Sequence, residues 1–278
     1  EVGREIARGG MGAILRGRDT DLGRDLAIKV LLDSHKDRPE VVSRFIEEAQ
    51  IGGQLQHPGI APVYELGQFA DERPFFTMKL VKGKTLAELL RERKTPSEDR
   101  GRFLGIFEHI CQTMAYAHNR GVIHRDLKPA NIMVGAFGEV QVMDWGLAKV
   151  LSSSDTADDA TVRETLEGSD VLRTMRSEGS NAPDESGSQT QMGSVIGTPA
   201  YKPREQALGK TDRVDERADV FGLGAILCEI LTGGPPYLGA DGKEVYRKAA
   251  SGELDECFAR LDQCDAESEL RDIARLVH

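Results

Sequence analysis

The stretch VIHRDLKPANIMV, residues 122–134, places a cluster of charge between two apolar ends. Those ends, 122–123 and 132–134, predict two short buried strands. Between them, residues 124–131 carry His, Arg, Asp, Lys and Asn. A charged run is usually a solvated surface segment, but this one is fixed at both ends by predicted core. Rigidly mounted polar loops are typical of catalytic and binding sites.

Length, composition and net charge argue against a membrane-spanning, secreted or nucleic-acid-binding chain. The chain has 278 residues, 39% of them hydrophobic and 29% charged, which is enough for one large domain or two lobes with a core. No apolar run reaches the roughly 18 residues needed to cross a bilayer, and no signal peptide opens the chain. The net charge of −10 argues against nucleic acid as a partner.

The expected location follows from the same features. The four cysteines show no metal-ligand spacing, and Cys111 and Cys228 lie in apolar helical patterns, where reduced core thiols are expected. We therefore expect a cytoplasmic chain with no membrane segment of its own. The sequence begins abruptly in a predicted strand, so a membrane anchor elsewhere in a longer parent protein stays open.

The chain divides into a strand-rich part and a helical part. Strands are predicted over 5–8, 13–19, 24–32, 61–69 and 73–81, with one helix over 40–55. From residue 86 the pattern is helical, with helices over 100–119 and 219–233. The second is apolar nearly all round, which predicts a buried helix that ends at the Gly-Gly-Pro-Pro run 233–236. Residues 152–193 are rich in Ser, Thr, Gly and acidic residues, which predicts a long mobile loop.

Three glycines, Gly9, Gly10 and Gly12, lie between the first two predicted strands. Glycine lets the backbone approach a ligand closely and present N–H groups to phosphate oxygens. An ordinary hairpin with a flexible tip explains the same pattern equally well.

Lys29 and Glu48 form a predicted ion pair. Glu48 falls within the apolar stripe of the 40–55 helix, and a buried carboxylate needs a cationic partner because its desolvation costs several kcal/mol. Lys29, in a predicted strand, is the natural partner, although a strand lysine can also reach solvent along its own stem. The pair would direct an ammonium group into a cleft.

Asp126 and Asn131 are five residues apart, and Asp144 follows thirteen residues later, directly after an apolar strand. Carboxylate and amide oxygens suit Mg²⁺, which also accepts phosphate oxygens of a substrate. We therefore expect Asn131 and Asp144 to hold Mg²⁺, which leaves Asp126 to orient a hydroxyl group.

In this order the motifs resemble those of eukaryotic-type (Hanks-type) serine/threonine protein kinases, most closely the bacterial branch. The resemblance runs from the glycine loop to roughly residue 277. It rests on LAIK around the phosphate-binding lysine, HRDLKPAN in the catalytic loop, DWG in place of Asp-Phe-Gly, the substrate-docking GTPAY, and the helix DERADVFGLGAILCEILTG.

The resemblance implies an α+β, bilobal protein kinase fold. Residues 1–81 would form a small β-rich N-lobe with one key helix and a hinge at 79–81. Residues 82–278 would form a larger, mainly helical C-lobe that is incomplete at its end. The C-lobe would carry the catalytic loop, 122–134, and an activation segment, 144–205, that contains the mobile insert 152–193.

The implied activity is transfer of the ATP γ-phosphate to Ser or Thr hydroxyls of proteins, with Mg²⁺, or Mn²⁺ as an alternative. Asp126 would orient the hydroxyl, Lys128 would steady the phosphoryl group, and Lys29, paired with Glu48, would hold the phosphates. Thr198 would contact Asp126 and Lys128 and help to dock the substrate. The nucleotide would be contacted by Gly9, Gly10, Gly12, Ile14, Ala27, Lys29, the gatekeeper Met78, the hinge residues Lys79, Leu80 and Val81, and Met133.

The sequence departs from the family pattern at several positions. Ala7 replaces the opening glycine, and Lys202 and Arg204 stand where the family has apolar residues or proline. Trp145 replaces phenylalanine, and we expect it to pack beneath the 40–55 helix, where Gly52 would leave room. The usual partner of Glu205, an arginine, would lie in a helix beyond residue 278.

Regulation is also implied. Arg125 would pair with a phosphorylated residue of the activation segment, and Thr190 and Ser194 are the candidates. We hypothesise that Thr190 or Ser194 is autophosphorylated in a homodimer. The alternative is that both are polar linker residues without a regulatory role. Because of the departures, a pseudokinase that binds nucleotide or acts as a scaffold remains the alternative to an active kinase. A kinase for small molecules is disfavoured by the docking segment GTPAY.

Overall fold

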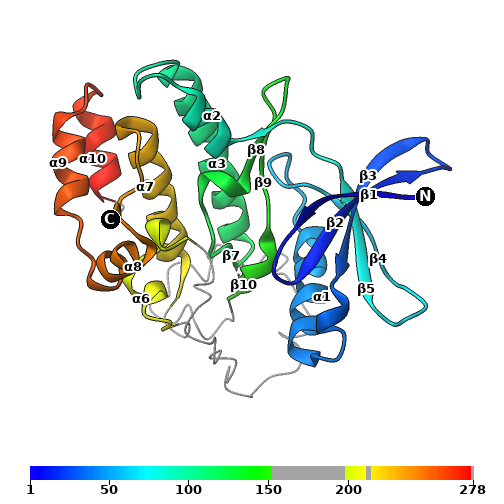
Figure 1. Cartoon of the computed structure of the whole chain (residues 1–278). Coiled ribbons are helices and arrows are strands. Elements are labelled where there is room, and N and C mark those ends of the chain that lie inside the picture. The colour runs from blue at the N-terminus through cyan, green and yellow to red at the C-terminus, as the bar shows by residue number, and fades with distance from the viewer. Residues whose placement is uncertain (152–197, 211–213, 277–278) are drawn as a thin grey trace, which may run out of the picture.

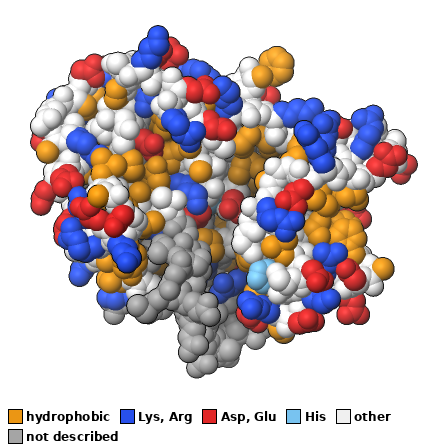
Figure 2. Space-filling model, in the orientation of Figure 1, with side chains coloured by type: hydrophobic (Ala, Val, Ile, Leu, Met, Phe, Trp, Pro, Cys, Tyr) orange, Lys and Arg blue, Asp and Glu red, His pale blue; other side chains and the backbone are white. Residues whose placement is uncertain are grey.

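The computed structural model of the chain describes residues 1–151, 198–210 and 214–276. Strands gather at one end of the molecule and helices at the other, with short strands between them (Figure 1). The expected bilobal α+β architecture is therefore confirmed. Figure 2 shows acidic and basic side chains interspersed over the visible face of both lobes.

The N-terminal lobe is built on one antiparallel sheet. Its five strands are β1 (Val2–Arg8), β2 (Gly12–Asp19), β3 (Arg24–Leu31), β4 (Val63–Gln68) and β5 (Pro74–Lys79), in the order β1-β2-β3-β5-β4. All five predicted strands are present. The central strand β3 is buried from Leu26 to Leu31, and Lys29 is the one charged residue in this otherwise apolar stretch.

Helix α1 (Pro39–Gln54) covers one face of this sheet, as the 40–55 prediction required. Its buried side chains include Phe45 and Ala49, which cluster with Leu31 of β3 and Phe76 of β5. Glu48 is buried on the same helix face. The apolar stripe thus brings a carboxylate against the sheet.

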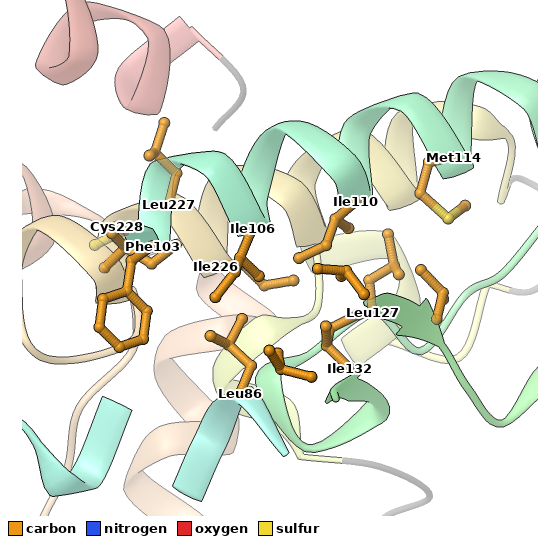
Figure 3. Close-up of a cluster of buried hydrophobic side chains, with 14 of the residues drawn as sticks. Leu86, Phe103, Ile106, Ile110, Met114, Leu127, Ile132, Ile226, Leu227 and Cys228 are labelled. Atoms are coloured by element: carbon orange, nitrogen blue, oxygen red, sulfur yellow. The ribbon is translucent and has the colours of Figure 1, made fainter. Parts of the chain in front are cut away.

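The C-terminal lobe consists mainly of helices. The described ones are α2 (Leu86–Glu92), α3 (Arg100–Asn119), α6 (Arg204–Ala207), α7 (Glu216–Thr232), α8 (Gly242–Ser251), α9 (Asp255–Gln263) and α10 (Ser268–Leu276). Helices α3 and α7 pack together, and Ile106 and Ile110 of α3 belong to the same core cluster as Ile226 and Leu227 of α7 (Figure 3).

Helix α7 is buried nearly all round, as its composition predicted. It ends where Gly233 adopts a φ of 83°, the left-handed conformation in which glycine avoids the strain of a side chain. Asp215 caps its first turn by accepting a hydrogen bond from the Arg217 N–H at 2.9 Å.

Two small sheets lie beside the helices. One pairs β7 (Val122–Ile123) with β10 (Lys149–Val150), and the other orders β6 (Lys84–Thr85), β8 (Ile132–Val134) and β9 (Val140–Val142). Strands β7 and β8 are the two apolar ends predicted for residues 122–134, and both are almost entirely buried. The charged loop between them is therefore anchored on both sides.

Two further expectations concern membrane-spanning helices and the state of the cysteines. Within the residues that the structure describes, no helix is long and apolar enough to cross a membrane. All four cysteines are free thiols; Cys228 is buried as expected, whereas Cys111 is half-buried.

Candidate active site

The loop between β7 and β8 is fastened to the core by one buried carboxylate. Asp219, on the first turn of α7, accepts hydrogen bonds from the backbone N–H groups of His124 at 2.7 Å and Arg125 at 2.8 Å. Its Oδ2 also lies 2.9 Å from Nε2 of His118. Arg125 has a φ of 65°, so these bonds hold a strained non-glycine residue in place.

The ring of His124 joins this loop to the segment that carries Asp144. Nδ1 accepts the N–H of Asp126 at 3.2 Å, which leaves Nε2 to donate to the carbonyl of Met143 at 3.0 Å. The N–H of Met143 donates in turn to the carbonyl of Asn131 at 2.8 Å. Asp144 is therefore positioned by its immediate neighbour, which is bonded to the loop on both sides.

Asp126 lies at the centre of the loop and is buried. Its Oδ2 accepts hydrogen bonds from Lys128 Nζ at 2.6 Å and from Asn131 Nδ2 at 3.0 Å. Its Oδ1 faces Nζ of Lys202 at 3.9 Å, which is beyond hydrogen-bond distance. The loop thus fixes Oδ2 of Asp126, whereas Oδ1 points towards Lys202.

The predicted pair of Lys29 and Glu48 is formed. Nζ of Lys29 lies 2.5 Å from Oε1 of Glu48 and 3.7 Å from Oδ1 of Asp144. Burial by itself would lower the pKa of Lys29, but Glu48 and then Asp144 reverse this, so its pKa lies above the usual value. Burial raises the pKa of Glu48, and Lys29 opposes that rise. We take the charged pair as the state at neutral pH, because each group favours the ionised form of the other.

The residues present fit a magnesium ion that shares its ligands with phosphate. Asp144 is more than half exposed beside Lys29, and the amide nitrogen of Asn131 is used by Asp126, which leaves the amide oxygen for a cation. In the described part of the chain, no three His, Cys, Asp or Glu side chains gather into a metal site. An ion here therefore needs further oxygen ligands, which is how Mg²⁺ is commonly bound with a nucleotide.

The predicted nucleotide-contacting residues come from adjacent strands. Ile14 of β2 pairs with Lys29 of β3, and Ala27 of β3 pairs with Met78 of β5. Met133 is half-buried on β8, which pairs with β6 and β9. The N–H of Lys79 donates to the carbonyl of Pro62 at 3.0 Å, so this donor is already used.

The glycine loop shows two different uses of glycine. The N–H of Gly9 donates to the carbonyl of Gly12 at 2.8 Å, which closes the turn, and Gly10 is open to solvent. A Cβ atom at Gly12 would lie 2.9 Å from the carbonyl oxygen of Val30. Gly12 is therefore required by the close approach of β2 to β3, a role that the sequence argument did not assign.

The contacts expected of Thr198 are not found among the described residues, and the phosphorylated partner expected of Arg125 lies outside them. Thr198 is exposed, and among the described residues no hydrogen bond joins its side chain to Asp126 or Lys128. The guanidinium group of Arg125 donates to the carbonyls of Leu147 at 2.6 Å and Ala148 at 3.3 Å, so it holds the segment after Asp144. Thr190 and Ser194, like the insert 152–193, lie outside the described residues.

Trp145 packs against α1 as expected, but the prediction that Gly52 leaves room for its ring was wrong. It is buried against the α1 side of the core, its ring meets the His124 ring edge-on at 4.7 Å, and its Nε1 donates to the Val142 carbonyl at 3.2 Å. A Cβ atom at Gly52 would instead meet Cγ2 of Val63 at 2.8 Å. Gly52 therefore makes room for β4, because this strand packs against α1.

Sequence reasoning missed two residues that build the site. Asp219 and His124 supply most of the hydrogen bonds that hold the loop. A signal for Asp219 was present, since it is an acidic residue at the start of a run, 219–233, that is apolar nearly all round. His124 was noted only as part of a charged cluster. Its ring is fully buried, which a polar loop position does not suggest.

Comparison with known proteins agrees with this geometry. A family model described as the protein kinase domain matches residues 1–274. The serine/threonine-protein kinase PknD of Protochlamydia amoebophila is 35% identical over 85% of this chain, and the serine/threonine-protein kinase PknB of Mycobacterium tuberculosis is 35% identical over 86%. PknB of Mycobacterium leprae is 36% identical over 86%.

The chain spans only part of these bacterial relatives, 23% of the PknD protein and 33% of each PknB protein. Because the match covers most of this chain, and the ion pair, the loop and Asp144 occupy the positions of the family's motifs, the chain belongs to the protein kinase family.

Proposed function

We propose that this chain is a Mg-ATP-dependent protein serine/threonine kinase. The observation that supports this most directly is the convergence of Lys29, Glu48 and Asp144, with Lys29 2.5 Å from Glu48 and 3.7 Å from Asp144. A kinase needs both the lysine–glutamate pair and the metal-binding aspartate in place. A scaffold has no need to keep a buried ion pair next to a second, exposed carboxylate.

Each residue has a defined task in this proposal. Lys29 binds phosphate oxygens of ATP, and Glu48 fixes the direction of its ammonium group. Asn131 and Asp144 supply oxygen ligands to Mg²⁺, which when bound neutralises charge on the transferring phosphoryl group. Ile14, Ala27 and Met133 enclose the adenine ring, next to the gatekeeper Met78.

The acceptor side of the site is formed by the loop. Oδ1 of Asp126 accepts a hydrogen bond from the substrate hydroxyl and orients it toward the γ-phosphate. Lys128, held on Oδ2 at 2.6 Å, stabilises the charge on the transferring group. Lysine at this position favours Ser and Thr over Tyr as the acceptor, and we infer Ser/Thr specificity from it and from the printed names of the relatives.

The proposal extends to regulation and to the division of the chain. Residues 1–81 and 82–278 form the two lobes, and the chain phosphorylates Thr190 or Ser194 in its own activation segment, within a homodimer. The partners are proteins that carry accessible Ser or Thr. Because the chain spans about a quarter to a third of its relatives, the activity and partners of a longer protein are part of this proposal as well.

The test is transfer of labelled γ-phosphate from Mg-ATP to the chain itself and to a generic protein substrate. Asp126→Asn and Asp144→Asn should abolish the label while thermal unfolding shows that both variants fold. Mn²⁺ in place of Mg²⁺ tests the choice of metal. If the unaltered chain transfers no label although ATP raises its Tm, the chain is a nucleotide-binding pseudokinase and the proposal is wrong.

Autophosphorylation has a separate test. Mass spectrometry of the chain after incubation with Mg-ATP should find phosphate on Thr190 or Ser194, and the signal should vanish in Asp126→Asn. Phosphate found only at other positions would contradict this assignment without touching the proposed activity.

A further inference from the structure

His35 connects the glycine loop to the segment that joins β3 to α1. It ends a short 3-10 helix, Asp33–His35, and its ring Nε2 lies 2.9 Å from the carbonyl oxygen of Gly10 at the tip of the glycine loop. A carbonyl oxygen only accepts, so the ring donates this hydrogen bond. The N–H of Leu32, in the same segment, donates to the carbonyl of Met11 at 3.0 Å. Two consecutive carbonyls of the loop are therefore held by residues 32–35.

The backbone of His35 is held without the help of its ring. Its N–H donates to the carbonyl of Leu32 at 2.9 Å, and its carbonyl accepts the N–H of Arg38 at 3.1 Å. The second ring nitrogen, Nδ1, is buried and has no hydrogen-bond partner among the described residues. A buried polar atom without a partner destabilises a fold, so an apolar side chain would suit folding better here. The ring contributes a donor for the loop instead.

The bond from His35 sets the direction of the next backbone donor. No peptide bond in the described part of the chain is cis, and a trans peptide directs its C=O and its N–H to opposite sides. Because the Gly10 carbonyl points to His35, the N–H of Met11 points away from it. This N–H has no acceptor among the described residues. Glycine at position 10 permits either orientation of the peptide, so a bond from outside the loop is needed to select one.

The tip of the loop borders the groups that would bind phosphate and metal. A Cβ atom at Gly146 would lie 3.3 Å from Cε of Met11 and 3.4 Å from Oδ1 of Asp144. A Cβ atom at Gly12 would lie 3.7 Å from Cε of Lys29. Backbone N–H groups of glycine-rich turns bind phosphate oxygens, and an unused N–H in this loop is suited to that role.

We propose that His35 is a positioning residue for phosphate binding. By holding the carbonyl of Gly10, it directs the N–H of Met11 toward the phosphates of ATP. This inference rests on the proposed kinase function and adds a residue that lies outside the motifs of the family. His35 contacts neither the nucleotide nor the acceptor, and it acts only through the backbone of the loop.

The test compares ATP with adenosine, which keeps the base and the ribose but has no phosphate. Calorimetric titration in the presence of Mg²⁺ measures the Kd of each ligand for the unaltered chain and for His35→Leu. The Kd of ATP should rise about three- to tenfold, as expected for one lost neutral hydrogen bond, and that of adenosine should change less than about 1.5-fold. In steady-state transfer, KM for ATP should rise by a similar factor while kcat stays within about twofold.

Two further variants separate the donor from the fold. His35→Gln places an amide N–H near the position of Nε2 and should return the Kd of ATP to within about twofold of the unaltered chain. His109→Leu removes a ring that makes the same kind of bond, to the carbonyl of Gly105 at 2.7 Å within α3, and should change neither Kd. The Tm of His35→Leu should fall by no more than about 2 °C, because the substitution also removes a buried nitrogen without a partner.

The outcomes distinguish this inference from the proposed function. An unchanged Kd of ATP in His35→Leu, or an equal loss for ATP and adenosine, would overturn the inference and leave the kinase activity standing. The same is true if His35→Gln binds ATP as weakly as His35→Leu does, since the donor would then not be the cause. No binding of ATP by the unaltered chain would overturn the proposed function and the inference together, a result distinct from the other three.

Discussion

The backbone N–H of Arg125 donates to Oδ1 of Asp219 at 2.8 Å, while Arg125 has a φ of 65°. A non-glycine residue in this conformation is strained by about 1–3 kcal/mol, so it persists only where its surroundings hold it. The carboxylate of a core helix therefore fixes the backbone directly before Asp126. The geometry of the reactive loop depends on α7 as much as on the loop itself.

Asp219→Asn should weaken both the fold and the activity. An amide has one acceptor oxygen, so one of the N–H groups of His124 and Arg125 would face the NH₂ group without a partner. We expect the free energy of unfolding to fall by about 1–3 kcal/mol, the cost of an unsatisfied buried donor. Phosphate transfer should fall as well, because Asp126 loses its support. Denaturant unfolding and single-turnover transfer measure the two effects.

Asp215→Asn is the matched control for Asp219→Asn. Asp215 begins the same helix with a side chain that is 46% exposed, against 1% for Asp219. Asparagine is an equally good N-cap residue, so a loss of no more than about 0.5 kcal/mol and unchanged transfer are expected. Equal effects of the two variants would show that the bonds from Asp219 to His124 and Arg125 contribute no more than the cap of α7 does.

The Lys29–Glu48 pair should respond asymmetrically to substitution. Lys29→Met leaves Glu48 buried without a cation, and removing one partner of such a pair costs about 3–5 kcal/mol. Glu48→Gln should cost less, because Lys29 keeps Asp144 at 3.7 Å. Adding Glu48→Gln to Lys29→Met should restore part of the lost stability. Denaturant unfolding of the three variants tests this, and additive effects would mean that the pair is not coupled.

Adjacent glycines of α1 should respond oppositely to alanine. At Gly53 a Cβ atom meets nothing within 4 Å, and replacing a helical glycine by alanine stabilises by about 1 kcal/mol. At Gly52 the same atom would lie 2.8 Å from Cγ2 of Val63, a β-branched side chain with little rotamer freedom. Overpacking costs about 1–3 kcal/mol, so Gly52→Ala should be neutral to destabilising.

The two alanine variants serve as controls for each other. Their unfolding free energies should differ by roughly 1–3 kcal/mol, in favour of Gly53→Ala. If Gly52→Ala stabilises the chain as much as Gly53→Ala does, then β4 does not pack against α1 as closely as the structure indicates.

Glu229→Gln should stabilise the chain at neutral pH more than at low pH. Burial raises the pKa of Glu229, while the hydrogen bond from Tyr201 and the charge of Arg93 oppose the rise. A carboxyl group with a raised pKa in the folded state binds its proton more tightly there. Its contribution to stability is therefore greatest below the ordinary pKa and is lost as pH rises through the folded value.

Glutamine cannot titrate but still accepts the Tyr201 hydrogen bond. The Tm of Glu229→Gln should exceed that of the unaltered chain by roughly 2–4 °C at pH 8, and the difference should shrink toward pH 4. Glu216→Gln, on an exposed position of the same helix, should show no such trend. A difference that grows as the pH falls would reverse the sign expected from burial.

Local pattern determined much of the architecture. The alternating and continuous apolar runs located β1 to β5, the helical spacing located α1 and α3, and the all-round apolar run of 219–233 identified α7 as buried. The pairing of Lys29 with Glu48 could also be inferred, because a carboxylate in an apolar stripe needs a cation nearby. Each of these inferences needs only the residue types and their spacing along the chain.

Other features depended on which distant segments meet. The sequence could not reveal that Asp219 supports His124 and Arg125, that Val63 fills the space at Gly52, or that Lys202 rather than Thr198 stands beside Asp126. These partners are separated by roughly ten to a hundred residues, and hydrogen bonds and steric contacts act only over a few ångströms. The sequence by itself determined the elements and the charged groups of the site. Tertiary packing decided which of those groups face one another.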